Sequence, residues 1–280
     1  MKARAPRRLL ALALGASALG CSTPSALAPN LQGSVGLPHA GFLVGGRELP
    51  PTGRGYRWKS KEDHHWGVPR LVGLLEEAAA HVDDARPGSR PLHVGDLSAK
   101  GGGALMPKHR SHRSGRDVDL LFYLTTLEGV PIPNDGFVKI GADGLGVSGA
   151  GRFVRFDVDR QWLLVRSLVA SKQAHVQWLF ISRPLEALLV EHALALGEPA
   201  ELVQKAQTVM QQPGDSLPHD DHIHLRVACE AEDFTHGCDG GGPSWAWLPR
   251  PPKKVEAPAR ELLEALLGPS VAPVGLTAAK

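Results

Sequence analysis

Apolar residues recur at helical spacing in several stretches of the chain. These stretches are 66–82, 157–171, 184–197 and 199–211. In the first of them the apolar positions are Val68, Leu71, Leu74, Leu75, Ala78 and Val82. Pro69 and Pro184 fit a first helical turn, Asp157 is suited to an N-cap, and Gly197 is a typical helix end. The pattern therefore predicts helices over these stretches.

Short apolar or β-branched runs between turn residues predict strands. They are 92–98, 118–126, 175–182 and 222–228. The segment 128–152 is predicted as a loop, because Gly and Pro repeatedly break any pattern there. A second loop, 213–220, leads directly into the last strand. Trp162 and Trp178 lie on apolar faces and are predicted to be core residues.

The first 21 residues have the features of an export signal. A basic start is followed by the apolar run 9–20, which is too short to span a bilayer. The run ends in the sequence ALGC, which resembles a bacterial lipoprotein box and so implies lipidation of Cys21. Ser22 comes next, and lipoproteins without Asp at that position usually go to the outer membrane. The alternative is an ordinary secretory signal with an incidental cysteine.

Composition changes again on both sides of the central part of the chain. Residues 22–65 are rich in Pro, Gly, Ser and Ala and are predicted to form a tether, although 31–50 could dock as short extended pieces. Ordered structure is expected from near Tyr56 or Trp58. The tail contains a short amphipathic helix candidate at 257–268 and is predicted to be an appendage. The chain is therefore divided into a signal (1–21), a tether (22–65), a domain (66–250) and a C-terminal appendage (251–280).

Charge and cysteine content narrow the class of protein. With 31 basic and 29 acidic residues, electrostatics give no argument for a nucleic-acid partner. The chain has 13 histidines and 32 glycines, which suits a loop-rich protein with side chains for coordination. Apart from Cys21, the cysteines are Cys229 and Cys238. In an exported chain a local disulfide is their simplest interpretation, and a metal clip is the alternative.

Two histidine-rich stretches carry the candidate chemistry: 109–120, HRSHRSGRDVDL, and 219–225, HDDHIHL. On a strand, residues two apart point to the same face, so His222 and His224 can face one cleft while Ile223 enters the core. One imidazole can hold a metal while the other carries protons near neutral pH. The alternative is a pair of surface histidines, because a lone H-x-H is weak evidence.

The first stretch strengthens the metal hypothesis. His112 and Asp119 flank Gly115, which fits one ligand on a loop, a turn, and a second ligand on the incoming strand. A carboxylate on a buried apolar strand is unfavourable without a cation, and metal ligation by Asp119 would remove that penalty. The alternative partners of Asp119 are Arg110, Arg113 and Arg116. Asp117 either orients an imidazole or caps the strand entrance. Two imidazoles, a carboxylate and an open position are the layout of a catalytic zinc site.

These motifs also carry a family resemblance. H-x-x-x-x-x-x-D followed later by H-x-H resembles the LAS metallopeptidases, the lysostaphin, D-Ala-D-Ala carboxypeptidase and hedgehog group. More closely, 94–103, 109–120 and 219–229 are similar to the penicillin-insensitive murein endopeptidases, over roughly Trp66 to Cys238. The resemblance implies an α+β fold: a small, mostly antiparallel sheet that carries the ligands, with helices and long loops around it. It also implies a Zn²⁺ cofactor bound by His112, Asp119 and His224.

The same resemblance implies roles for the remaining histidines. His222 would be the general base or transition-state stabiliser, and His219 would assist from the same cleft. His109 would be secondary, as a substrate contact or a ligand for an extra metal. The implied substrate is peptidoglycan (murein), cleaved at the D-alanyl–meso-diaminopimelyl bond, and the implied location is the periplasm. Zinc would lower the pKa of bound water towards about 7 and polarise the scissile carbonyl.

Two other functions compete with the endopeptidase. D,D- or L,D-carboxypeptidases of the same group usually place a Glu three residues before the last ligand, whereas His222 stands two before His224, which favours the endopeptidase. A non-catalytic murein-binding lipoprotein would be indicated by loss of His222 or His219, and neither is lost. Trp245 and Trp247 either flank the substrate groove or pack on the core. Known relatives carry more cysteines, and the sequence leaves the oligomeric state open, a homodimer included.

Overall fold

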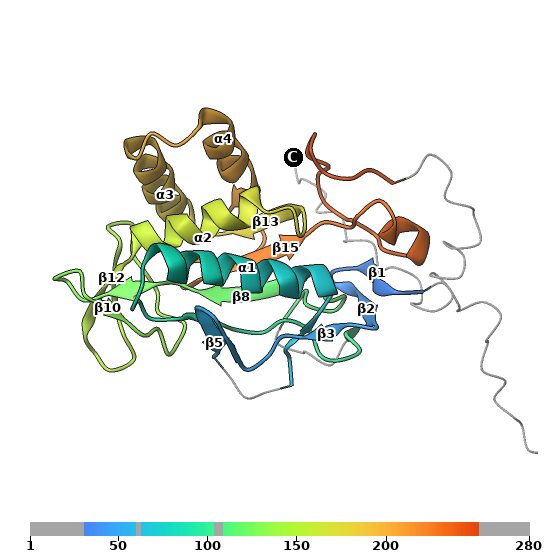
Figure 1. The fold of residues 1–280 in the computed structure, drawn as a ribbon, viewed down its shortest axis with the longest axis horizontal. Coiled ribbons are helices and arrows are strands. Elements are labelled where there is room, and N and C mark those ends of the chain that lie inside the picture. The colour runs from blue at the N-terminus through green and yellow to red at the C-terminus, as the bar shows by residue number, and fades with distance from the viewer. Residues whose placement is uncertain (1–30, 60–62, 104–108, 252–280) are drawn as a thin grey trace, which may run out of the picture. The chain divides into compact units, whose positions relative to one another are not determined.

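The computed structural model describes residues 31–59, 63–103 and 109–251. Its central element is a seven-stranded sheet (Figure 1). In order across the sheet, the strands are β14 (Met210–Gln211), β13 (Val176–Phe180), β15 (His222–Val227), β8 (Asp117–Leu121), β7 (Leu92–Val94), β5 (Tyr56–Trp58) and β4 (Thr52–Gly53). Neighbours are antiparallel except for the β13–β14 and β5–β7 pairs, which are parallel. The sheet is therefore mostly antiparallel, as predicted.

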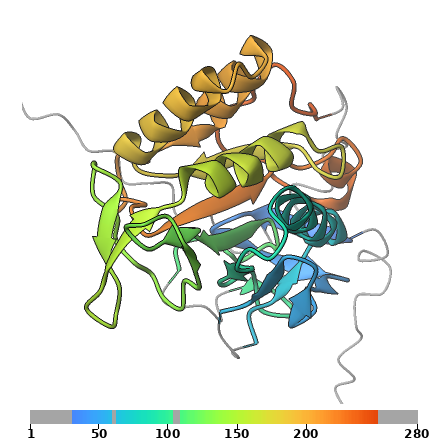
Figure 2. The same ribbon diagram turned by 60° about the vertical axis from the view of Figure 1, so that its left-hand side comes forward.

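Four helices in the described part of the chain pack against this sheet. They are α1 (Pro69–Ala85), α2 (Val158–Ala170), α3 (Arg183–Ala195) and α4 (Ala200–Val209). Each begins and ends within a few residues of its predicted bounds, because an apolar stripe along it is buried. Asp157 caps α2 as expected, since its carboxylate accepts a hydrogen bond from the Arg160 N–H. Both ribbon views place the helices together on one side of the sheet (Figures 1 and 2), which confirms the α+β fold.

The tryptophans lie partly as predicted. Trp162 of α2 is fully buried in the core. Trp178 is only half-buried, so its assignment to the core is wrong; it lies against Trp245, with 5.2 Å between the ring centroids. Trp245 donates a hydrogen bond to the Gln177 carbonyl oxygen at 2.9 Å, and both it and Trp247 pack against the edge of the core. Of the two alternatives for Trp245 and Trp247, packing on the core describes their contacts.

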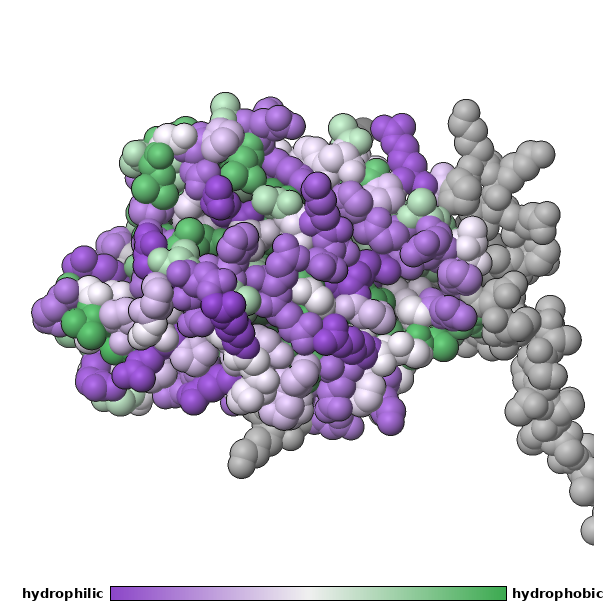
Figure 3. All heavy atoms as spheres, in the orientation of Figure 1, coloured by the Kyte–Doolittle hydropathy of each residue, from purple (hydrophilic) through white to green (hydrophobic). Residues whose placement is uncertain are grey.

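The segment predicted as one long loop, 128–152, contains strands of a second, four-stranded sheet. In order across it, the strands are β10 (Pro131–Ile132), β9 (Leu124–Thr125), β12 (Phe153–Phe156) and β11 (Leu145–Val147). The predicted strand 118–126 is accordingly divided between β8 and β9. Strands this short, set between Gly and Pro, leave no alternating pattern to detect. The face of the molecule in Figure 3 is mainly polar, with apolar side chains in small separate groups over α3 and this second sheet.

The folded part of the chain begins well before the predicted boundary at residue 66. Strand β1 (Gly33–Leu37) pairs with β2 (Ala40–Val44), and β3 (Arg47–Glu48) pairs with β6 (Trp66–Gly67). Val35 and Leu49 are fully buried. The alternative of docked extended pieces describes residues 31–50. Their partners lie far along the chain, as in the bridge between Gly36 and Cys238, so local composition does not reveal the packing.

The predicted disulfide is confirmed, since Cys229 and Cys238 are bonded. It closes a loop that contains a short 3-10 helix, η2 (Asp233–His236). The signal with Cys21 and the helix candidate at 257–268 lie outside the described residues and stay predictions. Within the described ranges, no helix has the length and apolar character needed to cross a membrane.

Candidate metal centre

Strands β8 and β15 bring the two histidine-rich motifs together in the middle of the main sheet. In their antiparallel register His224 stands opposite Asp119, and His222 stands opposite Leu121. Because side chains alternate along a strand, His222, His224 and Asp119 project to one face. Ile223 projects to the other and is fully buried. The structure therefore gathers the residues that the sequence singled out.

His112 reaches the same point from the loop before β8. Its backbone φ is 66°, in the left-handed region, which strains a residue other than glycine. The Ser98 hydroxyl holds this conformation by donating to the His112 carbonyl oxygen at 2.5 Å and accepting from the Gly115 N–H at 2.9 Å. Ring atom Nδ1 lies 2.9 Å from the Leu97 carbonyl oxygen. A carbonyl only accepts, so Nδ1 carries the proton and Nε2 carries the lone pair, 3.3 Å from Asp119 Oδ1.

His224 is oriented in the opposite sense. Its Nε2 lies 2.8 Å from Asp117 Oδ1, and Arg226 Nε donates to the same oxygen at 2.7 Å. Burial alone would raise the pKa of Asp117, but the Arg226 charge and the His224 hydrogen bond hold that pKa well below its usual range. The ionised carboxylate keeps the His224 proton on Nε2. The lone pair on Nδ1 then faces Asp119 Oδ1 at 3.2 Å. Of the two roles considered for Asp117, this contact favours orientation of an imidazole.

The atoms that meet here need a cation. Asp119 Oδ1 and His112 Nε2 are buried and have no hydrogen-bond partner among the described residues. Two imidazole lone pairs and a carboxylate oxygen are all acceptors, so they cannot satisfy one another. Ligands bound tetrahedrally to zinc at about 2.0–2.1 Å stand roughly 3.3 Å apart. The observed separations from Asp119 Oδ1 are 3.3 Å to His112 Nε2 and 3.2 Å to His224 Nδ1. The residues present fit such a metal ion.

His222 borders the same point from a more open position. Its Nε2 lies 3.5 Å from Asp119 Oδ1, and its side chain is 18% exposed, against 3% for Asp119. Its Nδ1 lies 2.5 Å from Asp221 Oδ1, which fixes the ring orientation. The ring of Phe137 stands edge-on to it, with 5.3 Å between centroids. His222 is therefore open to solvent where Asp119 is enclosed.

Proximity alone does not select three ligands. Ligand atoms of His219, His222 and His224 lie within 4.8 Å of one another, and so do those of His109, His112 and Asp119. Burial separates these residues into two sets. The side chains of His112, Asp119 and His224 are at most 8% exposed. The other histidines, His109, His219 and His222, are part-exposed.

The charges at the centre depend on one another. Burial alone would raise the pKa of Asp119, but the neighbouring His112 holds that pKa well below its usual range. Burial would likewise lower the pKa of His222, but the hydrogen bond to Asp221 and the Asp119 carboxylate raise it. For His219, burial and the neighbouring His222 outweigh the Asp119 and Asp221 carboxylates and lower its pKa to about 4. His219 is therefore a neutral acceptor near pH 7, whereas His222 gains a proton more readily.

His109 lies at the edge of the centre, attached to an acid that the sequence did not single out. His109 Nε2 lies 3.0 Å from Asp96 Oδ2, and its Nδ1 lies 3.8 Å from Asp119 Oδ2. Asp96 Oδ1 is also 3.7 Å from His64 Nδ1, and the Asp96 carbonyl oxygen accepts from the Asp119 N–H at 3.0 Å. The available signal was the segment 94–103, which carried part of the family resemblance without any role for Asp96.

The salt-bridge alternative for Asp119 is wrong. In the described part of the chain no arginine lies within ion-pair distance of Asp119, whose charged neighbours are histidines. Arg116 is buried elsewhere, donating to Ser34 Oγ at 3.0 Å and to the Asp239 carbonyl oxygen at 2.7 Å. Arg110 contacts the carbonyl oxygen of Asp215 instead, at 3.1 Å.

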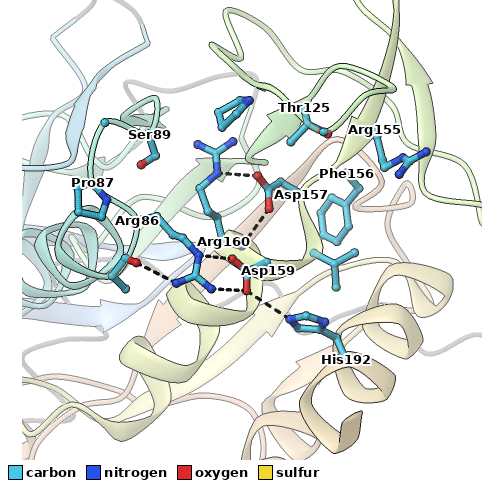
Figure 4. Close-up of a pocket in the computed structure, with 15 residues that line it drawn as sticks. Arg86, Pro87, Ser89, Thr125, Arg155, Phe156, Asp157, Asp159, Arg160 and His192 are labelled. Atoms are coloured by element: carbon cyan, nitrogen blue, oxygen red, sulfur yellow. Dashed lines mark hydrogen bonds and ion pairs between the residues drawn. The ribbon is translucent and has the colours of Figure 1, made fainter. Parts of the chain in front are cut away.

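A separate cavity, of about 820 Å³, lies between the end of α1 and the start of α2 (Figure 4). Two ion pairs lie in its wall: Arg86 with Asp159 and Arg160 with Asp157, each at 2.6 Å. His192 adds a contact to Asp159 at 3.7 Å. No residue of the two motifs lines it. This cavity is therefore separate from the candidate centre on β8 and β15.

Comparison with known proteins agrees with the site. A family model described as penicillin-insensitive murein endopeptidase matches residues 34–244, which include both motifs and the early strands. A protein of that name from Haemophilus influenzae is 24% identical, over 78% of this chain and 74% of its own length. Proteins of that name from Klebsiella pneumoniae and Escherichia coli are also 24% identical, over 92% of this chain and 96% of theirs. The chain therefore belongs to the penicillin-insensitive murein endopeptidase family.

Proposed function

We propose that this protein is a zinc-dependent murein endopeptidase that hydrolyses D-alanyl–meso-diaminopimelyl cross-links. The observation that carries the proposal is the convergence of buried acceptor atoms on His112, Asp119 and His224 beside the more open His222. Relatives that span most of the chain are named murein endopeptidases, which supports peptidoglycan as the substrate.

His112 Nε2, Asp119 Oδ1 and His224 Nδ1 would hold the zinc. When bound, zinc would supply a Lewis acid that polarises the scissile carbonyl and brings the pKa of a water towards about 7. The Leu97 carbonyl and the Asp117 carboxylate keep the two imidazoles in the tautomers that ligation needs. His109, attached to Asp96, stays a substrate contact or a ligand for an extra metal.

His222 would move the proton. Its Nε2 faces the centre while Asp221 holds Nδ1, so the ring can accept a proton from the attacking water and deliver it to the leaving amine. In its protonated form His222 would also stabilise negative charge on the carbonyl oxygen. His219, with 5.2 Å between its ring centroid and that of His222, would accept a hydrogen bond from the same cleft. No serine acyl-enzyme would be required, which would account for the insensitivity to penicillin that the relatives' names state.

The location of the enzyme is part of the proposal. Residues 1–21 would direct export, and lipidation of Cys21 would anchor the domain at the outer membrane, facing murein in the periplasm. Residues 22–30 would then serve as the tether. Incorporation of labelled palmitate into the wild-type protein, and its loss in Cys21→Ala, is the expected result.

The test of function is digestion of purified murein by the full-length protein in detergent. Wild type, His222→Ala and His175→Ala are each assayed with zinc and with chelator, and products are separated by chromatography and mass. His175 is a matched control, because it is another strand-end histidine paired with an acid, Glu230, outside the centre. Wild type and His175→Ala should convert cross-linked dimers to monomers with zinc and not with chelator. His222→Ala should convert no dimers under either condition.

Other outcomes select the competing functions. Release of terminal D-Ala without loss of dimers would identify a carboxypeptidase. Folded, zinc-loaded protein that binds murein and cleaves nothing would identify a binding lipoprotein.

A further inference from the structure

Lys59 lies at the same end of the main sheet as His222. It directly follows β5, and its N–H donates to the Val94 carbonyl oxygen of β7 at 2.7 Å. Val94 pairs with Leu120 of β8, next to Leu121, which stands opposite His222 on β15. Neighbouring positions on β7, β8 and β15 therefore connect Lys59 to His222 across the sheet.

Phe137 connects the side chains of Lys59 and His222. The Phe137 and His222 rings stand nearly perpendicular to each other, with 5.3 Å between centroids. The Lys59 ammonium lies over the face of the Phe137 ring, 5.1 Å from the centroid. A cation in this position is attracted by the ring and keeps its hydrogen-bond donors available. Phe137 is 43% exposed, so it also presents apolar surface to a bound molecule.

The charge of Lys59 is not neutralised by the described part of the chain. None of the carboxylates described there lies within ion-pair distance of Lys59 Nζ. Asp135, an acid in the same wall as Phe137, pairs with Arg57 at 3.1 Å instead. A part-buried ammonium without an internal counterion favours an external anion.

Phe137 shares a cavity wall with further positive charges. The ring lines a cavity of about 680 Å³, and the wall of that cavity includes Lys139 and Arg152. Both of these cations are exposed. The approach to His222 past Phe137 is therefore suited to an acidic ligand.

We propose that Lys59 and Phe137 form a subsite for a carboxylate of the substrate. The proposal rests on the proposed function, because the ligand is part of the murein cross-link. In a D-alanyl–meso-diaminopimelyl bond, the carbon that bears the leaving amine also bears a free carboxylate. With the amine placed to receive a proton from His222, this carboxylate points along Phe137 towards the ammonium.

The subsite determines specificity. Lys59 binds the carboxylate beside the scissile nitrogen, while Phe137 packs against the carbon between them. Peptide bonds whose leaving residue lacks that carboxylate, including those to amidated diaminopimelate, gain nothing from the subsite. Lys59 acts in binding, whereas the metal ligands and His222 act in the reaction.

The test compares two soluble muropeptide dimers that differ only in this carboxylate, which is free in one and amidated in the other. The full-length wild type, Lys59→Met, Lys59→Arg and Lys205→Met are assayed with zinc in detergent. Lys205 is the matched control, because its ammonium also lies over an aromatic ring, 5.8 Å from the centroid of Trp247, and it belongs to α4. Titration calorimetry measures binding of the free-carboxylate dimer to the zinc-free proteins.

For the free-carboxylate dimer, Lys59→Met should raise KM and weaken binding about tenfold with little change in kcat, as expected for one charge-assisted contact. On the amidated dimer it should equal the wild type. Lys59→Arg, which keeps the positive charge, should have a KM and an affinity close to those of the wild type. Lys205→Met should have the same KM as the wild type on both dimers.

Two results would overturn the subsite and leave the endopeptidase in place. One is that Lys59→Met raises KM equally for both dimers; the other is that the wild type has the same KM for the free-carboxylate and the amidated dimer. A wild type that cleaves neither dimer would overturn the proposed function. Calorimetry then decides the subsite by itself, since only a carboxylate subsite makes zinc-free Lys59→Met bind the free form more weakly.

Discussion

Two buried polar clusters meet at strand β8, and they differ in whether the protein completes them. Arg116, immediately before the strand, is fully buried and donates to Ser34 Oγ and to the carbonyl oxygens of Val227 and Asp239, at 2.7–3.2 Å. Asp119 is equally enclosed, but its Oδ1 accepts no hydrogen bond from the described residues and faces imidazole nitrogens instead.

The difference indicates that the Arg116 cluster stabilises the fold, whereas the Asp119 cluster is suited to binding a ligand. The Arg116 cluster joins β1 to the end of β15 and to the residues that directly follow Cys238, and its donors are matched by acceptors, so it stabilises the fold. The Asp119 cluster combines buried acceptors with a strained backbone at His112. An incomplete polar cluster lowers stability unless a ligand completes it, which is how a metal site differs from a structural network.

The largest expected effect tests the incomplete cluster. Asp119→Ala removes the carboxylate ligand, so cleavage of murein dimers should fall at least about 10⁴-fold, or ~5.5 kcal/mol in barrier. Zinc at about 100 times its Kd should stabilise the wild type by about 2.7 kcal/mol and should not stabilise the variant. Rates and urea unfolding with and without zinc check this. The exposed Asp143→Ala is the control, and a variant that still gains stability from zinc would refute the assignment of Asp119.

The complete cluster should respond in stability instead. Arg116→Met leaves several carbonyl oxygens unpaired in the interior, so the free energy of unfolding should fall by about 3–5 kcal/mol. Activity per folded, zinc-loaded molecule should stay near the wild-type value. Urea unfolding and titration of active sites measure the two quantities, with the exposed Arg155→Met as control. A loss below about 1 kcal/mol would mean that the Arg116 bonds contribute little.

Asp117 stands between the clusters in sequence and in role. Asp117→Asn weakens the bonds that hold the His224 proton on Nε2 and removes the charge facing Arg226, so zinc affinity should fall about 10–100-fold. Activity at saturating zinc should change much less. Competition with a chelator measures the affinity. Asp233→Asn is the matched control, since Asp233 pairs with Arg70 in a similarly enclosed position outside the centre. An unchanged zinc affinity would argue against orientation by Asp117.

The same contrast explains how much of the fold could be predicted from the sequence. The sequence predicts helices α1 to α4 to within a few residues, because an amphipathic stripe is a local pattern. The strands within 31–58 were assigned to a tether, because they are short and Gly-rich and acquire partners only in the fold. β5 pairs with β7, and Ser34 meets Arg116, across long separations in sequence.

The candidate site divides in a similar way. His112, Asp119, His222 and His224 could be named because donor type and spacing reveal metal chemistry, and the structure brings them together; their roles stay predictions. Their surroundings could not be named. Nothing in the sequence around Phe137 or Lys59 distinguishes them, and the segment 94–103 indicated no role for Asp96, since the contacts of all three depend on the order of strands across the sheet.

The smallest expected effect concerns pH and the zinc-free protein. The pKa of His219 is lowered to about 4 in the folded state and is about 6.5 in an unfolded chain. Between these two pKa values the unfolded state binds more protons than the folded state, so the free energy of unfolding rises with pH. The contribution of His219 to stability is therefore present above about pH 6.5 and is lost as the pH falls to about 4. The slope contributed by His219 is at most ~1.4 kcal/mol per pH unit.

Subtraction isolates this contribution. Urea unfolding of the zinc-free wild type and of His219→Asn is measured between pH 7 and 4.5. Between pH 6.5 and 5.5 the free energy of unfolding of the wild type should fall by up to about 1 kcal/mol more than that of His219→Asn. The Arg116 cluster contributes no slope there, since burial lowers the Arg116 pKa only to about 10 and it stays charged. Parallel curves for the two proteins would show that His219 titrates normally and that its burial adds no sensitivity to acid.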